Sequence, residues 1–307
     1  MTKIYDDLIL LDAEDDAAKD ASRNGFLKTA CDALDDFLEI ALQAVYPNVC
    51  LLCGEPAATP KRNLLRIKTP VDALICNRCR SLLVAPTNAF CKRCGAPTRP
   101  GNASGLCERR CGANLAFDLV YPLNFYKGLT RSVVLRLKRE SDPLLARMLG
   151  ALCFEARRIQ IERFRPDCVV AVPMNWRRRA LRAGVNSPDS IAKEIALRLG
   201  VPALSKRIKR TRATAPQTAV DWERRASNVR GAFDVAKPFL PFFSRRDAVA
   251  PFANKRVALV DDAFTTGATA NEVARVLKAS GADAVLFLAL ARAGLGGARR
   301  ENRSDRP

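Results

Sequence analysis

The sequence predicts an α/β protein in which a parallel sheet is flanked by helices and preceded by a small cysteine-rich module. Three short apolar runs, at residues 166–173, 257–260 and 284–290, are typical of strands buried inside a parallel sheet. Segments with helical spacing of apolar residues separate these runs, which is the alternation of an α/β fold. Eight of the eleven cysteines lie between residues 50 and 111, ahead of the first run.

Composition and charge limit the kinds of ligand and of catalytic residue that this protein can use. The 307 residues are enough for one large or two medium domains with ample core. The formal net charge is +19, yet residues 1–46 contain four basic and eleven acidic side chains, so the remainder is strongly basic. Such a charge attracts polyanions, either phosphorylated metabolites or nucleic acid. Histidine is absent, which excludes histidine bases, histidine-activated nucleophiles and histidine metal ligands.

No targeting or membrane-spanning segment is evident in the sequence. It has no run of about 20 apolar residues, and its acidic first residues lack the basic start of a secretory signal. We therefore expect a cytoplasmic protein without a membrane span. In that compartment a cluster of cysteines favours metal ligation over disulfide bonds.

The cysteines form two sets with the spacing of zinc knuckles. The first set is two C-x₂-C pairs, and the second is a C-x₂-C pair followed by a C-x₃-C pair. Zinc takes four tetrahedral thiolates, and each short pair supplies two of them from one tight turn. We predict two structural zinc sites, at Cys50, Cys53, Cys76 and Cys79, and at Cys91, Cys94, Cys107 and Cys111. The alternative is a set of reduced thiols without metal. Basic residues beside these cysteines either contact nucleic acid or form a solvated face.

The chain after the cysteine module alternates between strand and helix patterns. Asp142 has the position of a helix N-cap with Pro143 in the first turn, and Gly200 that of a helix terminator. A polar, basic stretch at 207–231 has little periodicity and is typical either of a functional loop or of a disordered segment. We predict strands at 117–126, 166–173, 257–260 and 284–290. We predict helices at 129–139 and 142–164, a helix that is capped by Ser187 or Asp189 and ends at Leu199, and a helix that begins at Thr269.

These patterns divide the sequence into four segments. The first is an acidic tail with a helix at 1–46, and the second is a double zinc ribbon at 47–114. An α/β domain follows at 115–293, and a disordered basic tail occupies 294–307.

The most informative stretch, residues 257–278, reads VALVDDAFTTGATANEVARVLK. An apolar strand leads into two acids, Asp261 and Asp262. Thr269 and Glu272 have the spacing of a capping box, so we expect a helix to begin at Thr269. Between the acids and the helix lies a small, hydroxyl-rich turn formed by Thr265, Thr266, Gly267, Ala268 and Thr269.

This stretch suits a sugar phosphate. Free N–H groups and the helix dipole make the start of a helix an anion site, and Gly267 and Ala268 let a phosphate approach the backbone. The nearby carboxylates would repel a phosphate but accept hydrogen bonds from sugar hydroxyls. The alternative is an ordinary strand-to-helix turn with a solvated acidic pair.

A basic cluster, Arg177, Arg178 and Arg179, follows the predicted strand at 166–173. In an open α/β sheet, ligands bind at the carboxyl ends of neighbouring parallel strands. The cluster is therefore a candidate for a second anion site. The alternative is a solubilising basic face on the next helix.

The order of these parts resembles the ComF family of competence-associated, phosphoribosyltransferase-like proteins, over roughly residues 46–293. The resemblance is carried by the runs CLLCG, CNRC, CKRCG, LRLKRESDP, VVAVPMNWRRRALRAG, RTRATAPQ…ERRASNVRGAF and VALVDDAFTTGAT. The last run is shared with type I phosphoribosyltransferases in general. The chain departs from the family pattern at Ala171, where a proline is usual, and at 184–187, where Gly-Phe-Asn-Gln is usual.

The resemblance implies a type I phosphoribosyltransferase-like fold that binds Mg-PRPP or a related sugar phosphate. It would place the ribose hydroxyls on Asp261 and Asp262, which would be the catalytic residues, and the 5′-phosphate on the turn at 265–269. The pyrophosphate would lie near 177–179, and Mg²⁺ would bridge pyrophosphate and ribose oxygens. The implied reaction transfers ribose-5-phosphate to an unidentified nitrogen nucleophile.

The family's link to DNA uptake implies an alternative function, because a fold does not guarantee its usual reaction. In this alternative the zinc ribbons and the basic surface would engage single-stranded DNA or a helicase partner. The PRPP pocket would then be non-catalytic.

Overall fold

The structure is a computed structural model, and it describes residues 49–57, 74–99, 102, 104–107, 111, 115–140, 142–174, 187–212, 225–236 and 251–293. The chain forms two compact units, residues 1–50 with 54–76 and residues 51–53 with 77–307. The predicted tail and helix at 1–46 and the predicted basic tail at 294–307 lie outside the described residues. The predicted domain limits stay a prediction.

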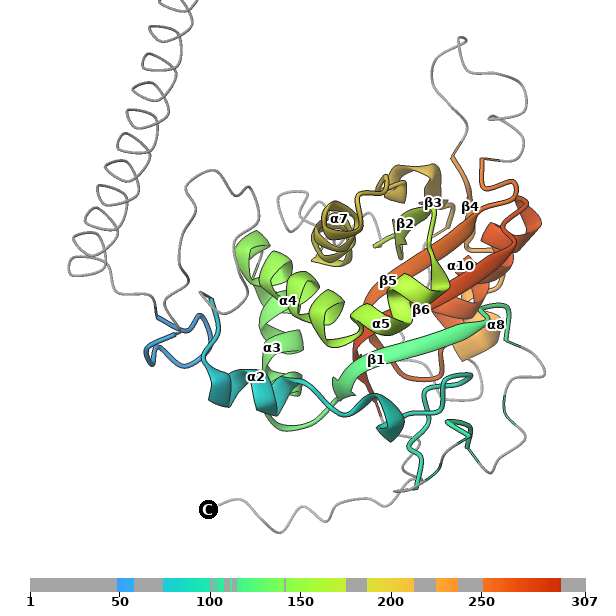
Figure 1. Ribbon diagram of the computed structural model, residues 1–307. Helices are drawn as coiled ribbons and strands as arrows, with labels where there is room; N and C mark the ends of the chain where they lie inside the picture. Colours follow the sequence, from blue (N-terminus) through green and yellow to red (C-terminus); the bar gives the residue numbers. More distant parts are fainter. Residues whose placement is uncertain are drawn as a thin grey trace, which may run out of the picture. The chain divides into compact units, whose positions relative to one another are not determined.

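A four-stranded parallel sheet organises the second unit (Figure 1). All three neighbouring strand pairs are parallel. This confirms the predicted α/β fold with a parallel sheet flanked by helices. In spatial order the strands are β1 (Leu119–Phe125), β6 (Ala284–Arg292), β5 (Arg256–Phe264) and β2 (Cys168–Ala171).

The two central strands are buried on both faces, as their continuous apolar runs predict. Residues 257–260 of β5 and 285–291 of β6 are each 2 % exposed or less. Burying one large apolar side chain contributes roughly 1.5–3 kcal/mol, so these strands hold the core together. Strand β5 extends four residues beyond its apolar run, and both acids therefore lie within the strand and not in the turn after it.

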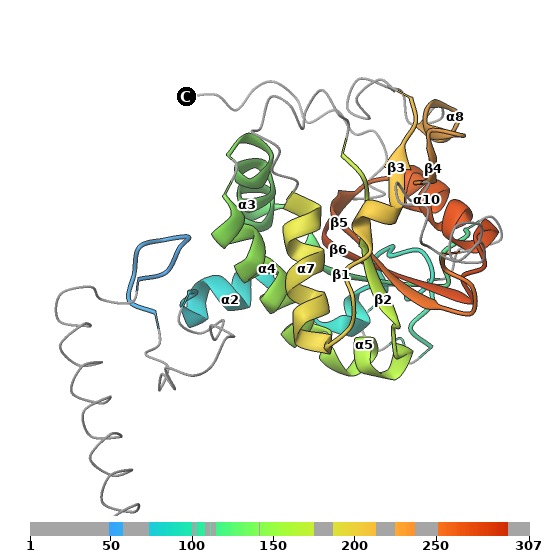
Figure 2. The ribbon, with the colours of Figure 1, turned by 90° about the horizontal axis from the view of Figure 1, so that it is seen from above.

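Helices cover both faces of this sheet (Figure 2). Helices α3 (Gly128–Arg139), α4 (Pro143–Ala156) and α7 (Ser187–Leu199) lie on one side, and α10 (Ala268–Ala279) lies on the other. The alternation along β5 matches this arrangement, because Leu259 belongs to the same core cluster as Val273 and Leu277 of α10. Where α4 meets α7, a Cβ on Gly150 would lie 2.9 Å from the carbonyl oxygen of Ile191. Glycine at this position allows the close approach.

The start of α4 confirms the predicted cap. The carboxylate of Asp142 accepts a hydrogen bond from the N–H of Leu145 at 2.9 Å, and Pro143 occupies the first turn. The predicted single helix at 142–164 was wrong, however, because the segment forms two helices, α4 and α5 (Arg158–Phe164).

The break between α4 and α5 lies at Arg157, whose φ of −120° and ψ of 17° are not helical. Its guanidinium is buried and donates to the carbonyl oxygens of Ala85, Pro122 and Leu123 at 2.7 to 3.0 Å. These bonds satisfy a charged group that would be costly to bury unpaired. Tertiary contacts therefore override the helical pattern of the segment.

The remaining elements are short. Strands β3 (Ile208–Arg210) and β4 (Phe233–Val235) pair antiparallel, and α8 (Arg225–Val229) precedes β4. The predicted loop at 207–231 is thus ordered at both ends, and its centre lies outside the described residues. Helix α2 (Asn77–Leu83) and single 3₁₀ turns at Thr87–Ala89 and Ser205–Arg207 complete the described elements. Within the described residues, none of the helices combines the length and apolar content that crossing a membrane requires.

Candidate functional site

The paired acids lie near the carboxyl end of β5. A carboxylate oxygen of Asp262 is 3.5 Å from the ammonium of Lys138 on α3, and Asp261 accepts a hydrogen bond from the N–H of Asp262 at 2.8 Å. Burial raises the pKa of Asp261 to about 8, and the negative charge of Asp262 adds to this rise. Lys138 and the N–H of Asp262 act in the opposite direction. Burial and the neighbouring charge therefore favour the protonated form of Asp261, and Lys138 lies beside Asp262.

The turn after the acids is shaped by Gly267. Its φ of 80° is left-handed, a conformation that glycine adopts at little cost. A Cβ there would meet its nearest atom, on Phe264, at 3.7 Å, so backbone geometry and not space selects glycine. The hydroxyl of Thr266 accepts a hydrogen bond from the N–H of Ala268 at 3.2 Å, which closes the turn onto the start of α10.

The predicted capping box at Thr269 was wrong. Helix α10 begins at Ala268 with Gly267 as its N-cap, and no side chain caps it. The side chain of Glu272 does not cap the helix. Its carboxylate accepts a hydrogen bond from the N–H of Gly231 at 2.7 Å and forms an ion pair with Arg275 at 2.7 Å. The left-handed glycine starts the helix one residue early, and Glu272 anchors the segment that precedes β4.

One cavity brings the predicted acid and turn together. Its volume is about 200 Å³, and it lies at the carboxyl ends of β1 and β5 and the start of α10. Asp262 does not line this cavity, but it forms an ion pair with Lys138, which lines the cavity. The cavity is lined by Tyr126, Lys138, Asp261, Ala263, Phe264, Thr265, Thr266, Gly267, Ala268, Thr269, Ala270 and Ala293.

Two of these residues, Tyr126 and Lys138, were missed by the sequence analysis. Tyr126 directly follows β1, and the rule that ligands bind at the carboxyl ends of parallel strands could have indicated it. Lys138 lies in the basic run of α3, and nothing in its spacing distinguishes it from the neighbouring arginines.

The structure describes the strand that leads to the predicted second anion site but not the arginines of that site. Strand β2 ends at Ala171, whose partner is Val260, and the N–H of Val172 donates to the carbonyl of Val260 at 2.8 Å. The chain therefore leaves the sheet next to Asp261. Arg177, Arg178 and Arg179 lie outside the described residues, so their place in the site stays a prediction.

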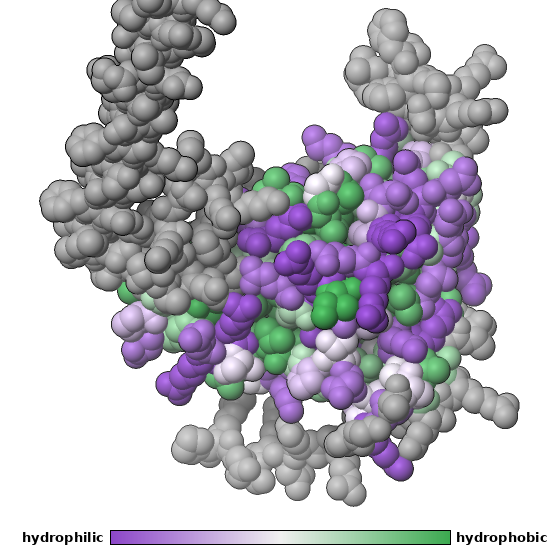
Figure 3. Space-filling model, in the orientation of Figure 1, coloured by the Kyte–Doolittle hydropathy of each residue, from purple (hydrophilic) through white to green (hydrophobic). Residues whose placement is uncertain are grey.

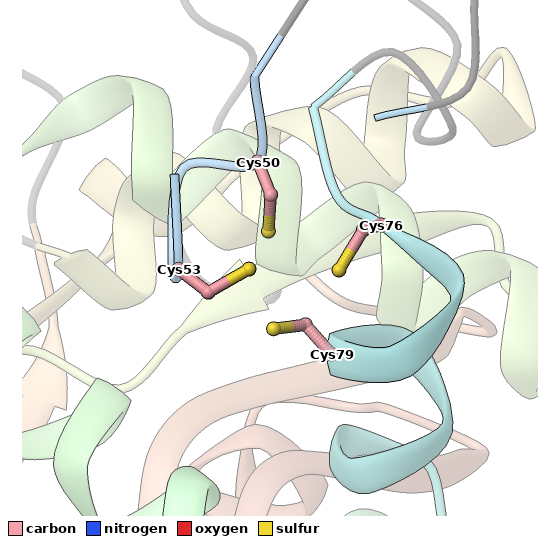
Figure 4. Close-up of side chains that lie close together, drawn as sticks. All are labelled: Cys50, Cys53, Cys76 and Cys79. Atoms are coloured by element: carbon pink, nitrogen blue, oxygen red, sulfur yellow. The ribbon is translucent and has the colours of Figure 1, made fainter. Parts of the chain in front are cut away.

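The first cysteine cluster is the one predicted from spacing, and its four sulfurs point toward one another (Figure 4). Cys50 and Cys53 come from one tight turn, Cys76 precedes α2, and Cys79 lies within it. The four sulfur atoms lie within 4.8 Å of one another.

The second cluster also matches the prediction. Cys91 and Cys111 have sulfurs 3.5 Å apart, and those of Cys94 and Cys107 are 3.7 Å apart. A tetrahedral zinc ion with bonds of about 2.3 Å needs thiolate sulfurs about 3.8 Å apart. The donor set and its spacing therefore fit zinc, with four protein ligands and no position for a substrate.

The two clusters share one backbone motif. In the first, the N–H of Gly54 donates to the carbonyl of Cys50 at 2.9 Å; in the second, the N–H of Gly95 donates to that of Cys91 at 2.7 Å. Both glycines have left-handed φ angles, 76° and 68°. The repeat explains why a glycine follows each of these knuckles in the sequence.

These features define a class of protein: a double zinc ribbon joined to an α/β domain whose central strand ends in an acid pair and a glycine turn. A family model for a double zinc ribbon domain matches residues 41–113. Competence protein F of Haemophilus influenzae is 28% identical over 71% of this chain and 96% of its own length. DNA utilization protein YhgH of Salmonella typhi is 30% identical over 80% of this chain and 97% of its own. The chain belongs to the ComF family.

Two further likenesses are weaker. Competence protein ComFC of Streptococcus pneumoniae is 25% identical over 79% of this chain and 99% of its own. A solved structure of the allosteric regulatory enzyme of purine biosynthesis is 20% identical over 47% of this chain and 25% of its own, with a TM-score of 0.29.

Proposed function

We propose that this protein binds Mg-PRPP, or a related sugar phosphate, in the cavity at the end of β5. The observation that carries the proposal is the lining of that cavity, which includes both Asp261 and the turn at 265–269. A sugar hydroxyl and a phosphate, joined in one molecule, complement these two groups. The motif's resemblance to type I phosphoribosyltransferases supports the same ligand.

The turn holds the 5′-phosphate. Backbone N–H groups at the start of α10 and the dipole of the helix attract an anion, and the hydroxyls of Thr265 and Thr266 add donors. The left-handed backbone of Gly267 gives the turn its curvature. No charged side chain is needed for this contact.

Asp261 and Asp262 hold the ribose. The raised pKa of Asp261 and the nearby Lys138 lower the negative charge of this group, which lowers its repulsion of the phosphates. The carboxylate oxygens also suit Mg²⁺, which would neutralise charge on the pyrophosphate. In a reaction, a negative carboxylate beside the ribose would stabilise an oxocarbenium-like transition state.

Ribose-5-phosphate would pass to a nitrogen nucleophile whose identity the described residues leave open. We assign neutralisation of the leaving pyrophosphate to Arg177, Arg178 and Arg179. The course of β2 supports this assignment, because the strand ends beside Asp261 three residues before Met174.

Titration calorimetry with PRPP and Mg²⁺ tests the proposal. We expect saturable binding by the full chain and its loss in the double variant Asp261→Asn and Asp262→Asn. Asp234→Asn is the control, because it removes one exposed carboxylate from β4. Absence of binding, or equal binding by the double variant, would contradict the proposal.

The names of the relatives favour a second function, in DNA uptake. Competence protein F and DNA utilization protein YhgH match most of this chain, and its net charge of +19 suits a polyanionic partner. Figure 3 shows one face of the molecule, on which hydrophilic residues predominate and apolar residues form small groups. In this function the protein contacts single-stranded DNA or a helicase partner.

Salt dependence tests direct DNA contact. Affinity for a single strand that falls steeply with salt and varies little with sequence would support it. Failure to bind single-stranded DNA at low salt would contradict it. A cytoplasmic location suits both functions, because zinc ribbons need reduced thiols.

A further inference from the structure

A buried arginine joins the second zinc cluster to the phosphate-binding turn. Arg292 is the last residue of β6 and is 3% exposed. Its guanidinium donates to the carbonyl of Gly95, in the zinc knuckle, at 3.3 Å, and to the carbonyl of Thr265, in the turn. It also lies over the ring of Phe264, 4.3 Å from the ring centre. One side chain thus contacts both sites.

The hydrogen-bond acceptors of Arg292 are backbone carbonyls. Among the described residues, no carboxylate forms an ion pair with it, and its other hydrogen-bond acceptor is the carbonyl of Ala293 at 2.7 Å. A buried charge needs a partner of opposite sign or a full set of hydrogen bonds. Arg157, the other buried arginine of the described core, is held in the same way by carbonyls of three residues.

The thiolates of the second cluster lie around the same cavity as Arg292. A second cavity, of about 290 Å³, is lined by Arg292 together with Cys94, Cys107, Cys111 and Thr266. Four thiolates around Zn²⁺ carry a net charge of −2. Burial lowers the pKa of Arg292 to about 10, and negative charge on Cys94 opposes that fall. Arg292 therefore stays charged at neutral pH, and it lines the same cavity as the thiolates.

The knuckle and the turn also touch directly. A Cβ on Gly95 would lie 2.5 Å from the ring of Phe264, the residue before the turn. Arg93, inside the same knuckle, donates to the carbonyls of Leu115 and Phe117. Because Gly95 and Phe264 are closely packed, a change in the shape of the knuckle would press on the residue that precedes the turn.

We propose that Arg292 is the counter-ion of the second zinc centre, and that by bridging Gly95 and Thr265 it makes the affinity of the turn for phosphate depend on zinc at that centre. Arg292 is a positioning residue: it holds the backbone of the turn and does not touch the ligand. Only the ligand's identity rests on the proposed function. Because coupling between two binding sites is reciprocal, PRPP must also slow the loss of zinc from the second centre.

Removing each zinc separately gives the first test. Cys107→Ser disrupts the second centre, and Cys53→Ser disrupts the first, none of whose described cysteines lines either cavity. We expect Cys107→Ser to weaken PRPP binding about tenfold, a typical coupling, and Cys53→Ser to change it less than twofold. Equal weakening by both variants, or no weakening by Cys107→Ser, would overturn the proposal.

Substituting the arginine gives the second test, with a readout that does not depend on PRPP. Zinc released to a chromogenic chelator is followed in the full chain, which binds two equivalents. Loss of a residue around the ligands typically lowers metal affinity 10- to 100-fold. We expect Arg292→Met to lose one equivalent at least tenfold faster, and Arg292→Lys to retain that zinc better because it keeps the charge.

The two variants separate charge from bridging. Lysine cannot span the carbonyls of Gly95 and Thr265 as a guanidinium does. The Arg292→Lys variant should therefore bind PRPP more weakly than wild type, although it keeps the charge. Arg157→Met is the control for loss of a buried arginine: it should lower the melting temperature without accelerating zinc release. If Arg292→Met keeps both zinc ions as wild type does, the proposal fails. If wild type binds no PRPP, the proposed function fails and the zinc-release result still decides this inference.

Discussion

Replacing Asp261 by asparagine should stabilise the unliganded protein while removing its ligand. Asparagine keeps the shape of the side chain and cannot ionise. In the wild type, burial and the charge of Asp262 raise the pKa of Asp261 from 3.8 to about 8. A group that must ionise against such a rise opposes folding, so ionisation of Asp261 lowers the stability of the folded protein.

The sign and size of the effect follow from linkage. Between pH 3.8 and about 8 the folded state binds more protons than the unfolded state, so stability falls as the pH rises through that window. At about 1.4 kcal/mol per pKa unit, the wild type would lose about 4 kcal/mol between pH 5 and pH 8 that the variant keeps. Because the two carboxylates titrate as a pair, that value is an upper limit for the measured loss.

Urea denaturation of both proteins at pH 5 and pH 8, without ligand, measures the difference. The stability of Asp261→Asn relative to wild type should increase with pH, and its affinity for Mg-PRPP should be lost. Asp234→Asn controls for the change in net charge. Parallel pH dependences of wild type and Asp261→Asn would refute the reasoning, because they would show that Asp261 ionises without opposition in the folded state.

Three further predictions concern single positions. Gly150→Ala should lower the free energy of unfolding by about 1–3 kcal/mol, since its Cβ would lie 2.9 Å from the carbonyl of Ile191; an unchanged melting temperature would contradict this. Gly267→Ala should cost roughly 1–2 kcal/mol and weaken PRPP binding, whereas Gly200→Ala, with a similar φ of 73° and open space, should affect stability alone; equal PRPP affinities of the two variants would count against the turn. The hydrogen bond from Arg275, assisted by the N–H of Gly231, lowers the pKa of Glu272 below 4.5, so its stabilisation is present above pH 4.5 and is lost as the pH falls through the lowered value. Denaturation of wild type and Glu272→Gln at pH 7 and pH 3 should therefore differ more at pH 7, and a constant difference would be incompatible with that contact.

Much of the fold could be predicted because it depends on local patterns. The runs at 257–260 and 284–290 are continuous and apolar, and they form the two central strands. The cap at Asp142 and the left-handed Gly200 are determined by residues within one turn of the chain. The two cysteine sets were predicted in full because paired knuckles leave few ways to group eight ligands.

What could not be predicted depends on contacts between distant residues. The helical pattern at 142–164 continues through Arg157, and only its bonds to carbonyls some 35 or 72 positions away explain the break. Thr269 and Glu272 have the spacing of a cap, but the backbone of Gly267 occupies that role and Glu272 contacts Gly231.

The same limit applies to the candidate site. The sequence places Asp261 and the turn side by side, because a strand and the next helix must meet there. Lys138 and Arg292 reach the acids and the turn from other elements, and no spacing in the chain connects them. The features that set the charge of the site are therefore visible only in the folded structure.

A crystal structure of the full chain with Mg-PRPP would test the central claim most directly. We predict density for the 5′-phosphate against the backbone N–H groups of residues 265–269, with the ribose hydroxyls on Asp261 and Asp262. A phosphate bound elsewhere, or a turn that closes onto its own side chains and excludes the ligand, would contradict it.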